Sequence, residues 1–205
     1  MQPAEKTDYY NTIEKTGTTE YKDRGSRFIA FAFPINSKEG FSIQLKQLKK
    51  EHPKAVHHCF AYRLGLTNDN FRASDDGEPS GTAGKPILGQ IESRGLTNVA
   101  IIVVRYFGGT LLGVPGLINA YKTAASLVLQ TIPVINKPVE VFYLVKCDYP
   151  LVNEVMRIVK KFKGNILKQE LSLFPEISIA IPKSVDSEFF IHINELHNVK
   201  MEKLV

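Results

Sequence analysis

The chain has 205 residues, of which 43% are hydrophobic and 23% are charged, a balance that is typical of a globular protein. No apolar run approaches the roughly 18 residues of a membrane span, and residues 1–8 lack the apolar core of a secretory signal, so we expect a cytoplasmic protein without a membrane partner. The net charge of +5 lies in residues 1–137, which hold 17 Lys or Arg and 12 Asp or Glu, so a polyanion would bind there.

Residues 1–134 are predicted to form a first domain of the α+β class. Its apolar residues recur with the period of strands in some segments and of helices in others. The predicted elements are a strand over 28–34, a helix over 41–48, a strand over 57–64, a loop over 68–81, a helix around 87–91, a strand over 99–104 and a long helix with Pro115 in its first turn. Because residues 99–104 carry no polar side chain, we expect that strand to be buried on both faces.

The domain boundary is predicted in residues 131–138, which contain two prolines. Proline cannot donate to a ladder and disfavours helix at the preceding residue, so this segment is predicted to lack regular structure. Residues 138–205 then form the second domain. Its predicted elements are a strand over 141–147, a helix over 151–162 closed by Gly164, strands over 166–173 and 177–181, a helix over 185–196 with Ser184 as N-cap, and a strand over 200–205. This βαββαβ order is that of ferredoxin-like domains.

Two glycine-rich loops, residues 75–86 and 105–116, each lead into a predicted helix. A helix N-terminus offers unpaired N–H groups and a partial positive charge, and glycines let a backbone approach a ligand closely. Lys85 and Arg105 would add charge-assisted bonds to a phosphate or carboxylate. Neither loop has the spacing of a nucleotide-binding motif. The alternative is that these glycines serve tight turns and close helix–sheet packing.

The residues beside these loops complete a candidate surface for an anion or a nucleic acid. Strand alternation predicts that only one of Tyr106 and Phe107 is exposed, where it could stack on a base. The candidate residues are Lys85, Arg105, Tyr106, Phe107, Gly108, Gly109 and Gly113, with His57 and Arg72 as weaker candidates.

Asp75, Asp76 and Glu78 form an acidic group that could bind a hard cation or act as a base, although Asp-Asp-Gly is equally good turn chemistry. The spacing of the histidines and of the two cysteines does not match a metal centre. Cys59 follows His58 directly in a strand, so the two side chains point apart and do not form a nucleophile pair. We therefore assign no catalytic residue, metal or cofactor.

The run DDGEPSGTAGKPIL, followed by NVAIIVVRYFGGTLLGVPGLINAYKTAA, resembles the IMPACT family, whose bacterial members are the YigZ-type proteins. The resemblance covers most of residues 17–130. It implies for the first domain the fold of domain 2 of ribosomal protein S5, a left-handed βαβ arrangement with its helices on one face. The second domain fits the bacterial architecture, whose ferredoxin-like module is similar to a C-terminal domain of elongation factor G.

The resemblance also implies an association with translation. Eukaryotic relatives act in translational control by restraining a kinase of an initiation factor, but that partner system is eukaryotic and is not carried over to this bacterial architecture. The family is not an established enzyme family. The resemblance thus favours a non-catalytic binding protein that contacts RNA or the ribosome, or a translation-associated protein.

Two other functions stay open at this point. The chain could be an enzyme that acts on a small phosphorylated or acidic ligand, with Asp75, Asp76 or Glu78 as base or metal ligand and Arg105 as anion clamp. It could also be a protein-binding adaptor, which would show weak RNA affinity and one discrete partner.

Overall fold

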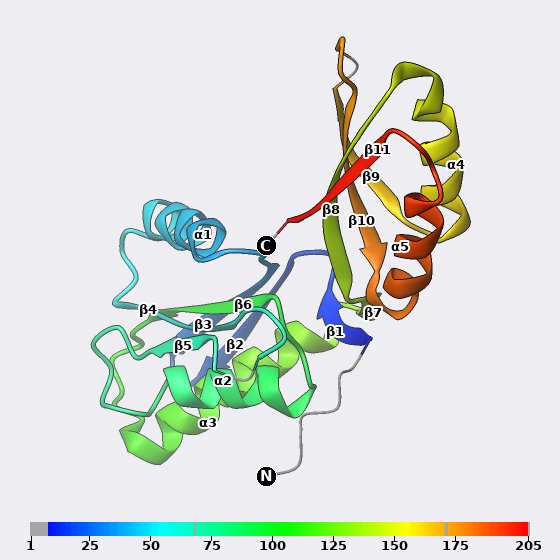
Figure 1. Cartoon of the computed structure of the whole chain (residues 1–205). Coiled ribbons are helices and arrows are strands. Elements are labelled where there is room, and N and C mark those ends of the chain that lie inside the picture. The colour runs from blue at the N-terminus through cyan, green and yellow to red at the C-terminus, as the bar shows by residue number, and fades with distance from the viewer. Residues whose placement is uncertain (1–7, 68, 171, 205) are drawn as a thin grey trace. The chain divides into compact units, whose positions relative to one another are not determined.

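The computed structural model describes residues 8–67, 69–170 and 172–204 (Figure 1). Positions 68, 171 and 205, which fall within predicted elements, lie outside the described residues, as do residues 1–7. Backbone contacts divide the chain into two compact units, a first unit of residues 10–136 and a second unit that groups residues 8 and 9 with 137–204. Among the described helices, none has the length and apolar character to cross a bilayer.

The first unit is built on a five-stranded sheet in which every neighbouring pair is antiparallel. Its strands, in spatial order, are β2 (Gly17–Asp23), β3 (Ser26–Pro34), β6 (Val99–Tyr106), β4 (His57–Arg63) and β5 (Phe71–Ser74).

Helices cover both faces of this sheet (Figure 1). α2 (Gly84–Ser93) and α3 (Gly113–Gln130) pack on one face, where they meet the odd-numbered residues of β6 such as Ile101. α1 (Lys38–Glu51) packs on the other face, against even-numbered residues such as Ile102. The predicted burial of this strand on both faces is confirmed. The expectation that all helices lie on one face is wrong, because a strand apolar on both sides needs cover on both.

The order of the strands brings the starts of two helices to one edge of the sheet. β4 lies between β5 and β6 and is antiparallel to each, so β5 and β6 run in the same direction and end at the same edge. α2 follows β5, and α3 follows β6. Both glycine-rich loops therefore lie at that edge, as Figure 1 shows for the segments before α2 and α3.

Four of the described strands were not predicted from the sequence. β2 and the short edge strand β5 belong to the main sheet, so part of the predicted loop over 68–81 is a strand. β1 (Tyr9–Ile13) and β7 (Val134–Pro138) pair in a separate two-stranded sheet. The prediction that residues 131–138 lack regular structure is therefore wrong, because a strand in a two-stranded ribbon has a free edge that tolerates proline.

The second unit is a ferredoxin-like βαββαβ domain, as predicted. Its elements are β8 (Glu140–Cys147), α4 (Val152–Lys161), β9 (Asn165–Glu170), β10 (Glu176–Pro182), α5 (Asp186–Asn194) and β11 (Val199–Leu204). The strands form an antiparallel sheet in the order β11-β8-β10-β9. One face of the sheet packs on both helices, with Ile177 and Phe189 fully buried in the shared core.

Two predicted helix ends in this unit are wrong. The residue in the left-handed conformation after α4 is Lys163, with φ 56°, not Gly164. Gly164 instead lies in a tightly packed place, because a Cβ there would lie 3.0 Å from the backbone oxygen of Ala180 and 2.4 Å from Cδ1 of Ile181. Ser184 does not cap α5, since the chain enters that helix through a short 3-10 turn and the N-cap residue is Val185.

Candidate functional site

The first acidic residue of the loop over 75–86 fills the start of α2. One oxygen of the Asp75 carboxylate accepts hydrogen bonds from the N–H groups of Ala83 and Gly84 at 2.9 and 2.8 Å, and the other accepts from Gly81 at 2.9 Å. Burial raises the pKa of the Asp75 carboxyl, but these three donors together hold it below its ordinary value. The N-terminus of α2 is therefore occupied by an anion of the chain itself.

The second acidic residue ties the same loop to β4. Asp76 adopts φ 42°, and its carboxylate accepts a hydrogen bond from the backbone N–H of His58 at 2.6 Å. Its other oxygen lies 3.5 Å from Nζ of Lys49, and its carbonyl oxygen lies 2.8 Å from Nδ1 of His57. Asp76 thus fixes the loop against the end of the strand.

The third acidic residue, Glu78, lies at the centre of a buried polar cluster. Its side chain is 3% exposed, and its Oε1 accepts from Nη1 of Arg105 at 2.6 Å and from the hydroxyl of Tyr121 at 2.7 Å. Nε2 of His57 lies 3.8 Å from the same oxygen. The Arg105 side chain is itself only 6% exposed, so the two charges neutralise each other inside the protein.

A buried thiol completes this cluster without adding reactivity. Sγ of Cys59 lies 2.9 Å from the carbonyl oxygen of Asp75 and 3.3 Å from the Tyr121 hydroxyl. Burial raises the pKa of the Cys59 thiol and, in the same way, that of Tyr121. Cys59 is therefore protonated at neutral pH, when a nucleophile would need to be a thiolate.

Arg105 also supports an aromatic ring at the surface. Its guanidinium lies 5.4 Å from the centre of the buried Phe28 ring and 5.7 Å from that of Phe107, which is half exposed. Tyr106 lies in the cluster on the α1 side, and its hydroxyl is 2.9 Å from Nδ1 of His52. Phe107, not Tyr106, is therefore the ring that is available for stacking.

The glycines of the loop over 105–116 have different roles. A Cβ on Gly108 would lie 1.9 Å from the backbone carbon of Gly25, so this glycine permits close contact with the β2–β3 turn. Gly109 and Gly113 adopt φ 85° and 69°, a region that other residues rarely occupy. The packing alternative thus accounts for Gly108, while Gly109 and Gly113 shape an exposed turn.

The N-terminus of α3 differs from that of α2 because no carboxylate caps it. Its N-cap residue, Leu112, makes no side-chain hydrogen bond, and its first turn holds no acidic residue. Residues 105–130 contain two cationic side chains, Arg105 and Lys122, and no Asp or Glu. This helix end therefore keeps its partial positive charge, and the segment that forms it brings no carboxylate to it.

Of the remaining candidate residues, Lys85 and His57 lie at this edge of the sheet and Arg72 lies on the opposite face. Lys85, the second residue of α2, is exposed, and His57 contacts the Glu78 cluster. Arg72 lies over the ring of Phe60 at 5.9 Å, on the α1 side of the sheet, and does not join them. Among residues 8–67, 69–170 and 172–204, no three His, Cys, Asp or Glu side chains are arranged to hold a metal ion.

Sequence reasoning missed Tyr121 as a functional partner, because it stands among the apolar positions of its helix. Its hydroxyl was the available signal, since a buried phenol needs a hydrogen-bond partner. It also missed Leu111, which lies in the loop with its side chain exposed.

Residues 24–129, which contain this whole edge, match the family model of the Impact N-terminal domain. The chain is 33% identical over 166 residues to IMPACT family member YigZ of Escherichia coli (strain K12), covering 80% of this chain and 81% of the relative. The chain belongs to the IMPACT family. Family member YvyE of Bacillus subtilis (strain 168) is 30% identical over 193 residues, which cover 94% of this chain and 89% of that protein.

The family resemblance extends through both units. A crystal structure of a hypothetical protein superposes with a TM-score of 0.75 at 28% sequence identity, and the match covers 97% of this chain and 98% of that one. That structure therefore shares both units of this chain.

Proposed function

We propose that this chain is a non-catalytic RNA-binding protein that acts in translation control, with ribosomal RNA as its target. The observation that carries the proposal is the open N-terminus of α3 with an exposed aromatic ring in the loop before it, at an edge where the carboxylates of Asp75, Asp76 and Glu78 all contact groups of the chain itself. Backbone N–H groups there can donate hydrogen bonds to a phosphate, and Phe107 can stack on a base. The link to translation rests on family membership and on what the resemblance to that family implies.

Lys85 and Phe107 are the side chains we expect to contact RNA. Lys85 is exposed near the start of α2 and can pair with a phosphate. Arg105 has a different role in this proposal, because its charge is already neutralised by Glu78. Its guanidinium lies 5.7 Å from the centre of the Phe107 ring, and we expect this cation–π contact to position the ring.

The internal contacts of the carboxylates argue against the enzymatic alternative. A general base or a metal ligand needs an accessible oxygen, whereas Asp75 caps α2 and the buried Glu78 holds Arg105 and Tyr121. Asp76 is 31% exposed, but one of its oxygens binds the backbone of β4 and the other lies 3.5 Å from Lys49. An enzyme built on these groups would have to break contacts that hold the loop in place.

The test is binding of the full chain to labelled single-stranded RNA and to ribosomes across a salt series. Phe107→Ala should weaken RNA binding by about 5- to 100-fold, the loss of one stacked base. Lys85→Ala should reduce the slope of log affinity against log salt by about 0.7, the value for one phosphate contact on a single strand.

Arg72→Ala is the matched control, because it removes an exposed cation of the same unit from the opposite face. It should leave both the affinity and the salt slope close to those of the unmodified chain. An equal loss in Arg72→Ala and Lys85→Ala would refute this surface. Absence of salt-sensitive binding to RNA and ribosomes would refute the function.

A further inference from the structure

Three aliphatic side chains are exposed to solvent in the loop before α3 and in the first turns of that helix. Leu111 is 82% exposed, Val114 51% and Ile118 39%. Val114 and Ile118 are four residues apart on the helix, so they are neighbours on one face, and the exposed Lys122 follows after four more. We call these four residues the α3 stripe.

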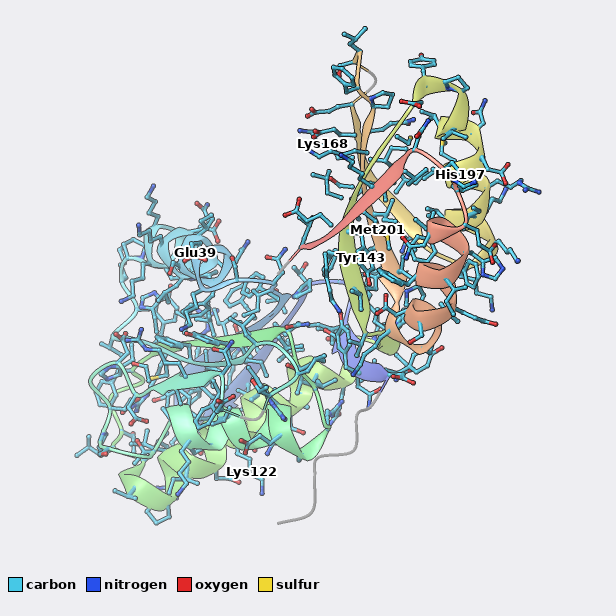
Figure 2. The ribbon with its side chains drawn as sticks, in the orientation of Figure 1. Glu39, Lys122, Tyr143, Lys168, His197 and Met201 are labelled. Carbon is cyan, nitrogen blue, oxygen red and sulfur yellow. The ribbon has the colours of Figure 1, made fainter. Side chains whose placement is uncertain are left out.

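The α3 stripe takes no part in the core. The buried face of α3 is formed by other residues, including Leu117, Tyr121 and Val128. Lys122 belongs to the layer on the side of the sheet opposite to Glu39 on α1 (Figure 2). Contact of three large aliphatic side chains with water is unfavourable in free energy. Their burial against a partner would be favourable.

The charge around the α3 stripe restricts what can cover it. Residues 105–130 hold no carboxylate, the stripe begins at the uncapped N-terminus of α3, and it ends at Lys122. Negative groups on a partner would be attracted at both ends, whereas residues 105–130 offer positive groups no carboxylate.

We propose that the α3 stripe is a docking surface for an acidic amphipathic helix of a partner protein. Rows of side chains at i and i+4 are the ridges by which one helix packs against another. Aliphatic side chains have no ring to stack on bases and offer no charge to phosphates, so this surface suits an apolar helix face better than RNA. The interaction is additional to RNA binding through Lys85 and Phe107.

The test uses synthetic helical peptides as probes for the full chain. One carries Leu along one helix face and Glu elsewhere, a second carries Lys in place of Glu, and a third has the Leu and Glu residues shuffled. We expect the Leu–Glu peptide to bind at least about tenfold more tightly than either of the others, as judged by fluorescence anisotropy.

The double variant Leu111→Ser/Ile118→Ser should reduce binding of the Leu–Glu peptide by about tenfold or more. Ile43→Ser is the matched control, because Ile43 is an aliphatic residue on α1 whose exposure of 64% lies between those of Ile118 and Leu111. It should leave the peptide affinity unchanged. Equal binding of the three peptides, no binding of the Leu–Glu peptide, or an equal loss in both variants would overturn the proposal.

RNA binding by the same double variant separates the two proposals. We expect it to bind RNA as the unmodified chain does, because Lys85 and Phe107 are intact. If the double variant loses RNA affinity to the extent that Phe107→Ala does, the α3 stripe is part of the RNA surface and the separate docking surface is refuted. If the RNA proposal fails while the peptide result holds, the α3 stripe stands alone.

Discussion

The N-termini of α2 and α3 lie at the same edge of one sheet, yet the chain treats them differently. At α2, the Asp75 carboxylate accepts bonds from three backbone N–H groups within 3 Å. At α3, no side chain caps the helix and no acidic residue stands in the first turn. The two ends share their place in the fold and their dipole, so the fold alone does not make a binding site. The placement of the carboxylates decides which helix end is capped and which stays open.

The largest effect expected from this comparison concerns Glu78, the carboxylate that neutralises Arg105. Glu78→Ala would leave the arginine buried without its partner and the Tyr121 hydroxyl without its acceptor. Loss of one partner of a buried pair costs about 3–5 kcal/mol, which should appear as a lower free energy of unfolding in urea, followed by circular dichroism.

Glu92→Ala is the matched control, because Glu92 is an exposed residue in the last turn of α2. Its effect should stay within about 0.5 kcal/mol. If Glu78→Ala is no more destabilising than Glu92→Ala, the Glu78–Arg105 pair does not hold this edge together. In that case Glu78→Ala should also leave RNA binding through Phe107 unchanged.

A smaller loss is expected when the anion at α2 is removed. Asp75→Ala deprives three backbone donors of their acceptor and should lower the free energy of unfolding by about 1–2 kcal/mol. Because the pKa of Asp75 is lowered in the folded protein, this stability is present above the ordinary value of 3.8 and is lost as the pH falls through the folded-state pKa.

Asp75→Asn keeps the shape and one acceptor oxygen but removes the charge. Unfolding measured between neutral and acidic pH should therefore show a flatter dependence for Asp75→Asn than for the unmodified chain below 3.8. Superimposable pH profiles would mean that the charge of Asp75 does not contribute at this helix end.

Much of the fold could be predicted from hydrophobic periodicity. The uninterrupted apolar run of β6 identified the central strand, and the alternation of Ile177, Ile179 and Ile181 identified a strand of the second unit. β2 and β5 lie at the edges of the sheet, and none of their residues is buried. Their polar residues hide the strand pattern, so periodicity could not identify them.

The candidate site was predictable in its location but not in its contacts. Glycines and Arg105 marked the loops, because those residue types are typical of anion sites. The pairing of Arg105 with Glu78 joins residues 27 positions apart, and the contact of Gly108 with Gly25 depends on the β2–β3 turn. Such contacts depend on how strands are ordered in the sheet, which a local pattern does not specify.

The smallest expected effects come from placing an aspartate at each helix N-terminus, and they compare the two ends most directly. Lys85 and Val114 are the second residues of α2 and α3, respectively, so each can be replaced by aspartate at an equivalent position. A carboxylate at an open helix N-terminus stabilises by about 0.3–1 kcal/mol, so Val114→Asp should raise the free energy of unfolding. Lys85→Asp should lower it, because the new charge is added to a helix start that the Asp75 carboxylate already occupies.

RNA affinity should fall in both aspartate variants, since Lys85→Asp removes a proposed phosphate contact and Val114→Asp places a carboxylate at the N-terminus of α3, which the RNA proposal assigns to a phosphate. Val114→Asp is therefore expected to gain stability while it loses RNA affinity, a combination that damage to the fold cannot produce. Val114→Asn places an uncharged side chain of the size of aspartate at the same position. It should therefore show a smaller gain in stability and a smaller loss of RNA affinity than Val114→Asp. If Val114→Asp lowers stability and RNA affinity together, the N-terminus of α3 is not the open anion site, and the difference between the two helix ends has no functional meaning.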